Sequence, residues 1–168
     1  MNSKFLSIRD LKKIKFKKIG SNAQISKNIT IIGEKNISIG SNVRIDDYTV
    51  ISSREGGLKI GSNVHIGAQS YLGCAGQIVI GNNVNISQGV RIYSKINNYL
   101  DYKRNNKILL GLVEIDNNVI IGSGTVLIGK CKISEGATIG ALSLVKNNLR
   151  KWSINAGIPA KFIRLRRR

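Results

Sequence analysis

Aliphatic residues recur every six positions along most of this chain. Taking the aliphatic that precedes the typical Gly gives six groups of three, with a spacing of six inside each group: Ile19, Ile25, Ile31; Ile39, Ile45, Ile51; Ile60, Ile66, Leu72; Ile80, Ile86, Ile92; Ile115, Ile121, Leu127; and Ile133, Ile139, Val145. Between groups the step is eight, nine, eight, twenty-three and six residues. Extra residues therefore enter only after every third hexapeptide, which indicates a coil with three sides and one corner that tolerates insertions.

This pattern predicts an all-β fold of about six stacked triangular coils over residues 19–145. A second inward position is expected four residues beyond the aliphatic on the first two sides, where small or β-branched residues recur: Ala23, Ile29, Val43, Thr49, Val64, Ser70, Val84, Val90, Val119, Thr125, Ala137 and Ser143. Gly and Asn in "IGSN" and "IGNN" suit the corners, since both tolerate positive φ. Helical periodicity is absent over residues 19–145, and a sandwich would need longer alternating strands.

Both ends of the repeat should be covered, because an open coil exposes strand edges. Residues 1–18 form an N-terminal cap in which a short helix (Ile8, Leu11) and an alternating strand (Ile14, Phe16) are both open readings. Residues 146–168 predict a strand, a Pro-started turn and a basic tail.

The net charge of +18 lies mostly on these two ends. Residues 1–18 carry seven Lys or Arg and one Asp, residues 146–168 carry eight Lys or Arg and no acid, and the 127 residues between are only +4. Such ends suit peripheral contact with an anionic membrane surface. A nucleic-acid partner is not expected, because no aromatic is interleaved with the basic tail and no recognisable motif is present.

The remaining composition points to a cytoplasmic protein without metal. No window resembles a membrane span or a signal peptide. Cys74 and Cys131 are too few for a disulfide scaffold and are expected to be reduced core residues. A zinc-dependent carbonic anhydrase needs three His ligands, and the single histidine, His65, excludes it.

Residues 119–164, which end in Ala156-Gly157-Ile158-Pro159-Ala160-Lys161, resemble the C-terminal half of hexapeptide-repeat acyltransferases. The resemblance extends over residues 19–164 and is nearest to sugar O-acetyltransferases and related enzymes of surface polysaccharide pathways. It implies a left-handed parallel β-helix, a homotrimer, and acetyl-CoA as acyl donor in the groove between neighbouring prisms. Matched to the family pattern, the donor would contact Ser123, Ala141, Lys146, Asn147, Lys161 and Arg164.

The repeat breaks at residues 93–112, the longest corner insertion. In the family this loop reaches over the thioester and usually carries a His that acts as general base. The matching stretch here, Ile92 to Tyr99, has none, and Asn97 and Asn98 stand where a subgroup has two carboxylates. An Asn amide orients a substrate but cannot take a proton at neutral pH.

The base is therefore unassigned. His65 is a candidate, because it should face outward in a column between Arg44 and Asn85. Asp101 and Lys95 in the loop are the others.

The expected function is transfer of an acetyl group from acetyl-CoA to a sugar hydroxyl or amino group in polysaccharide or lipopolysaccharide assembly. The acceptor would be a sugar, a sugar nucleotide or a lipid-linked saccharide. An amine acceptor that is already partly deprotonated needs a base least. The alternative is a trimeric scaffold that binds CoA or a sugar without catalysis.

Overall fold

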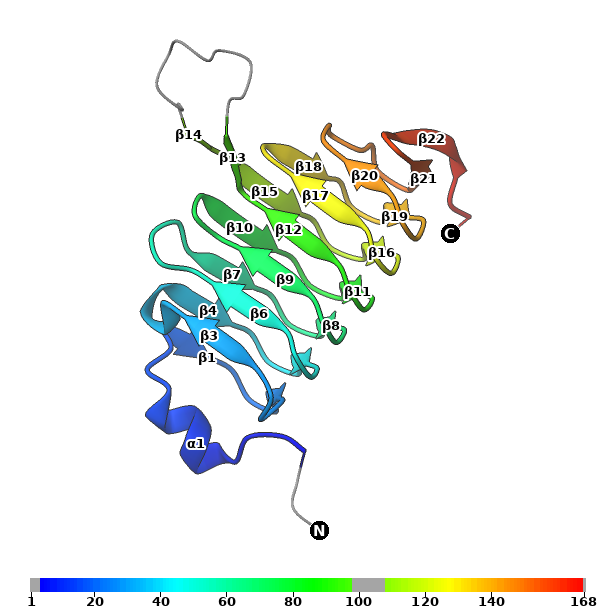
Figure 1. The fold of residues 1–168 in the computed structure, drawn as a ribbon. Helices are drawn as coiled ribbons and strands as arrows, with labels where there is room; N and C mark the ends of the chain where they lie inside the picture. The colour runs from blue at the N-terminus through cyan, green and yellow to red at the C-terminus, as the bar shows by residue number, and fades with distance from the viewer. Residues whose placement is uncertain (1–3, 98–107, 168) are drawn as a thin grey trace.

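The computed structural model describes residues 4–97 and 108–167, and the chain winds into a prism of stacked coils with three parallel sheets as its sides (Figure 1). The first sheet contains β1 (Lys18–Ile19), β4 (Ile37–Ile39), β7 (Leu58–Ile60), β10 (Gln77–Ile80), β15 (Leu112–Ile115) and β18 (Cys131–Ile133). The second contains β2 (Gln24–Ile25), β5 (Arg44–Ile45), β8 (His65–Ile66), β11 (Asn85–Ile86), β16 (Ile120–Ile121) and β19 (Thr138–Ile139), followed by β21 (Ser153–Gly157) and β22 (Ala160–Leu165). The third contains β3 (Thr30–Ile32), β6 (Val50–Ser52), β9 (Tyr71–Gly73), β12 (Arg91–Tyr93), β17 (Val126–Ile128) and β20 (Leu144–Val145). The prediction of about six triangular coils is confirmed.

The core is the stack of inward aliphatics. Of the eighteen predicted residues all are buried except Ile19 and Ile31, which are half-buried in the first coil. The second inward set shows the same end effect, because only Ala23 and Ile29 of that set are not fully buried. An end coil has a neighbour on one side only, so its side chains keep some exposure. Cys74 and Cys131 are buried and unpaired, as expected, and burial raises the pKa of their thiols to about 12 and about 11.

Glycine and asparagine have different structural roles at the corner between the first and second sheets. Asn63 has φ +57°, and its side-chain amide donates to Asn83 Oδ1 at 3.1 Å in a ladder that runs along the corner. Gly61 has no positive φ; instead, a Cβ on it would lie 2.5 Å from the carbonyl oxygen of Gly81 in the next coil. The expectation that both residues supply positive φ is therefore wrong for this glycine, which is required by close stacking of backbones.

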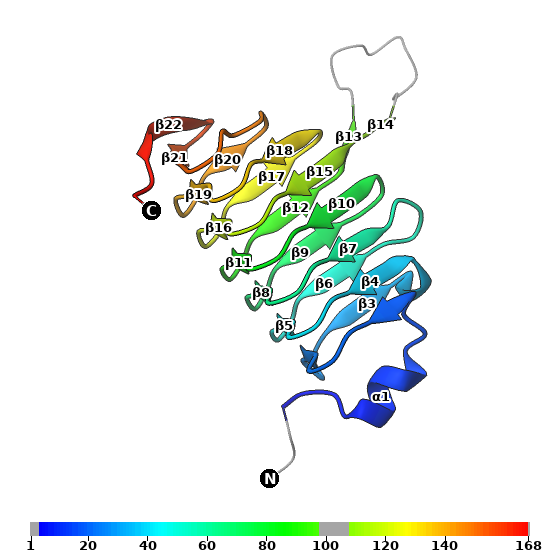
Figure 2. The same ribbon diagram turned by 180° about the vertical axis from the view of Figure 1, so that it is seen from behind.

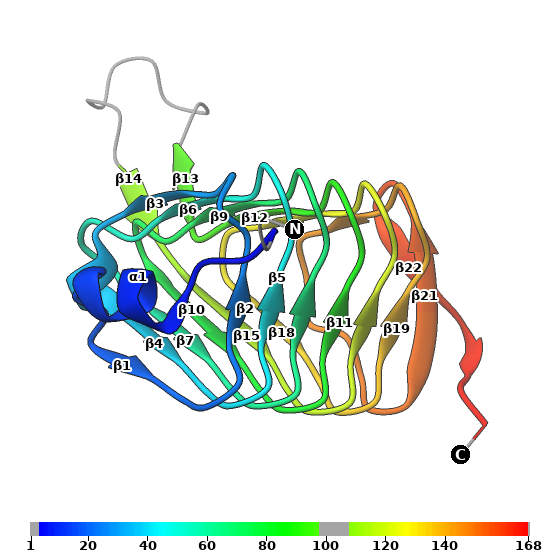
Figure 3. The same cartoon turned by 90° about the horizontal axis from the view of Figure 1, so that it is seen from below.

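Insertions enter at one shared corner, between the third sheet and the first sheet of the next coil. The corners there include the 3₁₀ turn η1 (Glu34–Asn36) and a hairpin of β13 (Lys95–Asn97) and β14 (Ile108–Leu110), which pair antiparallel. Figure 2 shows from behind how the hairpin leaves the prism beside β15. Figure 3 shows it on the side away from the short strands of the second sheet.

The N-terminal cap is a helix followed by an irregular segment. Helix α1 (Ile8–Lys13) begins with a capping box in which the Ser7 side chain accepts from the Asp10 backbone and the Asp10 carboxylate accepts from the Ser7 N–H. Ile14 and Phe16 form no strand with the first coil, although Phe16 packs against the core. The helix reading is therefore the one that the structure supports.

The C-terminal end is more regular than expected. Most of the predicted basic tail forms β22, which pairs antiparallel with β21 at the edge of the second sheet. Phe162 lies under the guanidinium of Arg150, 3.5 Å from ring centroid to Cζ, and Arg166 donates to the carbonyl oxygen of Asn118 at 3.0 Å. These contacts explain why a cationic segment stays folded against the prism.

Candidate active site

The base of the hairpin is fixed to the prism by backbone and hydroxyl hydrogen bonds. Ser94 is buried, and its Oγ donates to the Gly73 carbonyl oxygen at 2.8 Å. The N–H of Gly111 donates to the carbonyl oxygen of Ser94 at 2.7 Å, which closes the insertion at its foot. The register pairs Tyr93 with Gly73 and Leu112 with Gln77. Residues 95–110 therefore stand where the previous coil has Ala75 alone.

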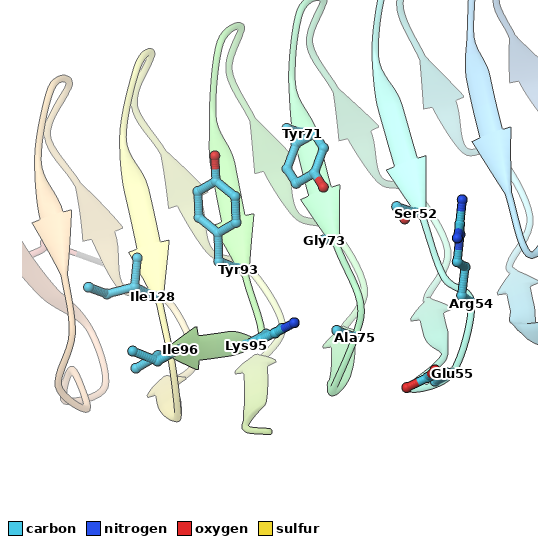
Figure 4. Close-up of a pocket in the computed structure, with 10 residues that line it drawn as sticks. All are labelled: Ser52, Arg54, Glu55, Tyr71, Gly73, Ala75, Tyr93, Lys95, Ile96 and Ile128. Carbon is cyan, nitrogen blue, oxygen red and sulfur yellow. The ribbon is translucent and has the colours of Figure 1, made fainter. Parts of the chain in front are cut away.

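A groove of about 550 Å³ lies at the foot of this hairpin, on the outer face of the third sheet (Figure 4). We call it the hairpin groove. Its lining combines two tyrosines with cations and aliphatics: Ser52, Arg54, Glu55, Tyr71, Gly73, Ala75, Tyr93, Lys95, Ile96 and Ile128. Its size is that of an ordinary small-molecule site. Lys95 lines it, whereas His65, the other predicted catalytic residue whose side chain the structure describes, does not.

Asn98 and Asp101 lie outside the described residues. For Asn97 the structure describes the backbone, which pairs with Ile108 in the hairpin. The predictions for these three side chains therefore stay predictions.

His65 lies on a different side of the prism. It is in β8 of the second sheet, between Arg44 and Asn85 in register, as predicted. It does not line the hairpin groove, so one chain alone does not bring it to the foot of the loop.

Both ring nitrogens of His65 are engaged by neighbours on the same face. Nε2 lies 2.9 Å from Asp46 Oδ2, and Nδ1 lies 3.2 Å from Asn85 Oδ1. The other oxygen of Asp46 accepts from Arg44 Nε at 2.8 Å. Burial alone would raise the pKa of Asp46, but the hydrogen bonds from His65 and Arg44 outweigh it and lower that pKa. A general base must direct a free nitrogen at the acceptor, and here both nitrogens are directed along the face.

The predicted donor contacts occupy three places near the last coils. Ser123 and Ala141 stack at the corner between the second and third sheets, where the N–H of Leu142 donates to the carbonyl oxygen of Ser123 at 2.8 Å. Lys146 and Asn147 follow β20 at the hairpin corner, and both are exposed. Lys161 and Arg164 are exposed on β22. The structure thus pairs Ser123 with Ala141 and separates this pair from Lys146 by the width of the third sheet.

Sequence reasoning missed Arg54, Tyr71 and Tyr93, which line the hairpin groove. They belong to outward positions of the third sheet and its corner, where the repeat pattern allows any polar residue. Tyrosine at two outward positions of consecutive coils was the available signal. Among the described residues no group of three or more His, Cys, Asp or Glu is placed to hold a metal ion. In the same part of the chain no helix is long and apolar enough to cross a membrane.

Comparisons with known proteins show the family to which the chain belongs. No protein-family model matches the sequence. The chain is 39% identical over 165 residues to the dTDP-4-amino-4,6-dideoxy-D-glucose acyltransferase of Escherichia coli, an alignment that covers 94% of this chain and 86% of that protein. It is 28% identical over 149 residues to the galactoside O-acetyltransferase of Escherichia coli K12, with coverages of 84% and 70%.

Solved structures agree. The N-acyltransferase AntD from Bacillus cereus, in complex with dTDP and 3-hydroxybutyryl-CoA, superposes with a TM-score of 0.91 at 34% identity, over 98% of this chain and 91% of AntD. A maltose O-acetyltransferase from Clostridium difficile, at 22% identity and a TM-score of 0.68, shares the fold. The chain belongs to the hexapeptide-repeat acyltransferases, left-handed β-helix proteins that transfer acyl groups from acyl-CoA.

Proposed function

We propose that this protein transfers an acyl group from acyl-CoA to the amino group of a dTDP-linked 4-amino-4,6-dideoxy sugar. The observation that carries the proposal is the 39% identity, over nearly the whole chain, to an acyltransferase named for this acceptor. The 34% identity to AntD, solved with dTDP and with acyl-CoA, supports the same pair of substrates. The sequence left a hydroxyl and an amino acceptor open, and of these two we propose the amino group.

Amine chemistry suits a site without a conventional base. A neutral amine already has a lone pair for attack on the thioester carbonyl carbon. Attack forms the C–N bond, the C–S bond breaks, and CoA leaves as the thiol after taking up the proton that the nitrogen loses. A hydroxyl must lose its proton during attack, a demand that a general base usually meets with a gain of about 10²–10⁴ in rate. Both ring nitrogens of His65, the single histidine, are engaged by neighbouring side chains. The lack of a free histidine base therefore favours an amine acceptor over a hydroxyl.

We propose that the donor lies along the corner formed by Ser123 and Ala141, with its phosphates toward the cations of the C-terminal segment. The small side chains at this corner leave room for a pantetheine arm. Lys146, Lys161 and Arg164 are exposed, so their cationic groups are accessible to phosphate oxygens. The donors to be compared are acetyl-CoA and 3-hydroxybutyryl-CoA, the second of which is bound by AntD.

We also propose a homotrimer in the cytoplasm. Support comes from large apolar side chains left exposed near the C-terminal end, where Leu142, Ile158, Ile163 and Leu165 are 58–75% exposed. Several large apolar side chains left exposed in one part of a protein are typical of a subunit contact. A nucleotide-linked acceptor is water-soluble, so contact of the basic ends with an anionic membrane is an additional proposal and not a requirement.

The test is thiol release with purified protein. Acetyl-CoA and 3-hydroxybutyryl-CoA are each supplied with dTDP-4-amino-4,6-dideoxyglucose, and separately with maltose or a galactoside. The proposal expects release of CoA only with the amino sugar, with a product whose mass shows one added acyl group. Binding of CoA with no turnover on the amino sugar would contradict it and favour a non-catalytic scaffold.

A further inference from the structure

Tyr71 and Tyr93 form an aromatic pair in the hairpin groove. Their ring centroids are 5.3 Å apart, and the ring planes are tilted by 36°. Strand register alone does not produce this pair, because Tyr71 stands opposite Arg91, and Tyr93 stands opposite Gly73. The ring of Tyr71 must therefore lean along its own strand toward the hairpin, as Figure 4 shows.

Gly73 makes this leaning possible. A Cβ on Gly73 would lie 2.8 Å from Cε1 of Tyr71 and 3.5 Å from its Oη. A side chain there would push the ring away, so the glycine is matched to the position of Tyr71. Both tyrosines remain half-buried, so part of each ring is accessible from the groove.

Two cations lie at the same groove. Arg54 is at the corner that follows β6, and Lys95 begins the hairpin; both are exposed. Figure 4 shows the Lys95 side chain pointing toward Ala75, across the foot of the hairpin. Among the described residues of the lining, Glu55 is the acidic one. The groove thus combines an aromatic surface with positive charge, whereas a pocket for an acyl chain would be apolar throughout.

We propose that the Tyr71–Tyr93 pair is the stacking platform for the base of the nucleotide-linked acceptor, and that Arg54 and Lys95 meet its diphosphate. The inference rests on the proposed function and adds the residues that recognise the nucleotide. Bases stack on aromatic rings without a need for sequence-specific contacts. A guanidinium or an ammonium beside them supplies donors for phosphate oxygens.

The test is calorimetric titration of dTDP and of thymidine without any acyl donor. Tyr71→Ala and Tyr93→Ala should each raise the Kd for dTDP and for thymidine about tenfold, which is the effect of losing one base–aromatic stack. Tyr71→Phe and Tyr93→Phe keep the rings and should stay within about threefold of the parent. Arg54→Gln and Lys95→Gln should raise the Kd for dTDP and leave the Kd for thymidine unchanged, because thymidine has no phosphate.

Tyr48→Ala is the matched control. Tyr48 is 66% exposed on the corner between the second and third sheets and does not line the groove. Its replacement should not change either affinity. Thermal unfolding and particle size are measured for every variant.

Two results overturn the inference while the proposed function stands. One is that the parent protein binds dTDP and that Tyr71→Ala and Tyr93→Ala bind it with the same affinity as Tyr48→Ala. The other is loss of dTDP binding together with a change in assembled size, since the tyrosines would then serve a subunit contact. If the parent neither binds dTDP nor acylates the amino sugar, the proposed function fails and this inference fails with it.

Discussion

His65 Nε2 lies 2.9 Å from Asp46 Oδ2, and the same carboxylate accepts from Arg44 Nε at 2.8 Å. The three side chains come from two neighbouring coils of the second sheet. A carboxylate only accepts, so Nε2 carries the proton in this contact. This arrangement resembles the orientation of a catalytic histidine, but the nitrogen that a base would use faces Asn85. We therefore regard His65 as part of the outer face of the second sheet.

Replacement of His65 tests this reading. We expect His65→Ala to lower kcat/KM for the amino sugar by less than about tenfold, because loss of a true general base costs about 10²–10⁴. The pH profile of kcat/KM should keep its shape, since the acceptor amine governs it. A loss of a hundredfold or more, with an altered profile and an unchanged fold, would restore His65 as the base.

Asp46 should make stability depend on pH in the acid range. Its pKa is lowered in the folded protein, so it stabilises the fold above its unfolded pKa of about 3.9, and this contribution is lost as the pH falls through the folded value. Asp46→Asn should therefore cost about 1–2 kcal/mol at pH 7. The difference in unfolding free energy should shrink toward pH 3. A difference that is constant over this range would show that the carboxylate charge is not involved.

The donor corner is tested by filling it. Ser123→Leu and Ala141→Leu should each raise the Kd for CoA at least tenfold, because the added side chain occupies the place of the pantetheine arm. Ala68→Leu is the control, since Ala68 occupies the same corner nearer the N-terminus, where the N–H of Gly89 donates to its carbonyl oxygen. Equal CoA affinity in all three variants would place the donor elsewhere.

Removal of the hairpin tests whether it is needed for acyl transfer but not for the folding of the coils. Residues 95–110 occupy the place of Ala75 in the preceding coil, so replacement of the whole segment by one Ala should leave the coils intact. We expect a thermal midpoint within a few degrees of the parent and loss of acyl transfer. Transfer that persists at the parental rate would show that the loop is not part of the active site.

The repeat could be predicted from sequence because each inward aliphatic stacks on its equivalent in the next coil. A spacing of six is therefore a direct record of position, and Ile66 or Ile86 is assigned without knowledge of the rest of the chain. The positions of functional side chains do not follow from the repeat in this way. The lean of Tyr71 over Gly73 depends on side-chain packing between two positions that the repeat leaves free.

Other parts depend on contacts that no repeat encodes. β22 is held by pairing with β21 and by contacts such as Arg150 on Phe162, so the sequence showed only a basic tail. The column of Arg44, His65 and Asn85 was predictable, because register follows from the repeat. The hydrogen bonds that engage both nitrogens of His65 were not, since Asp46 lies just beyond the strand.

The most direct test compares two acceptors that differ at one reacting atom. The kcat/KM is measured with the same acyl-CoA for dTDP-4-amino-4,6-dideoxyglucose and for dTDP-glucose, which presents a hydroxyl at that carbon. We predict that the amino sugar is acylated and is preferred by at least about a hundredfold, the lower range of what a missing general base costs a hydroxyl acceptor. Equal acylation of both acceptors, or acylation of the hydroxyl alone, would contradict the proposed function.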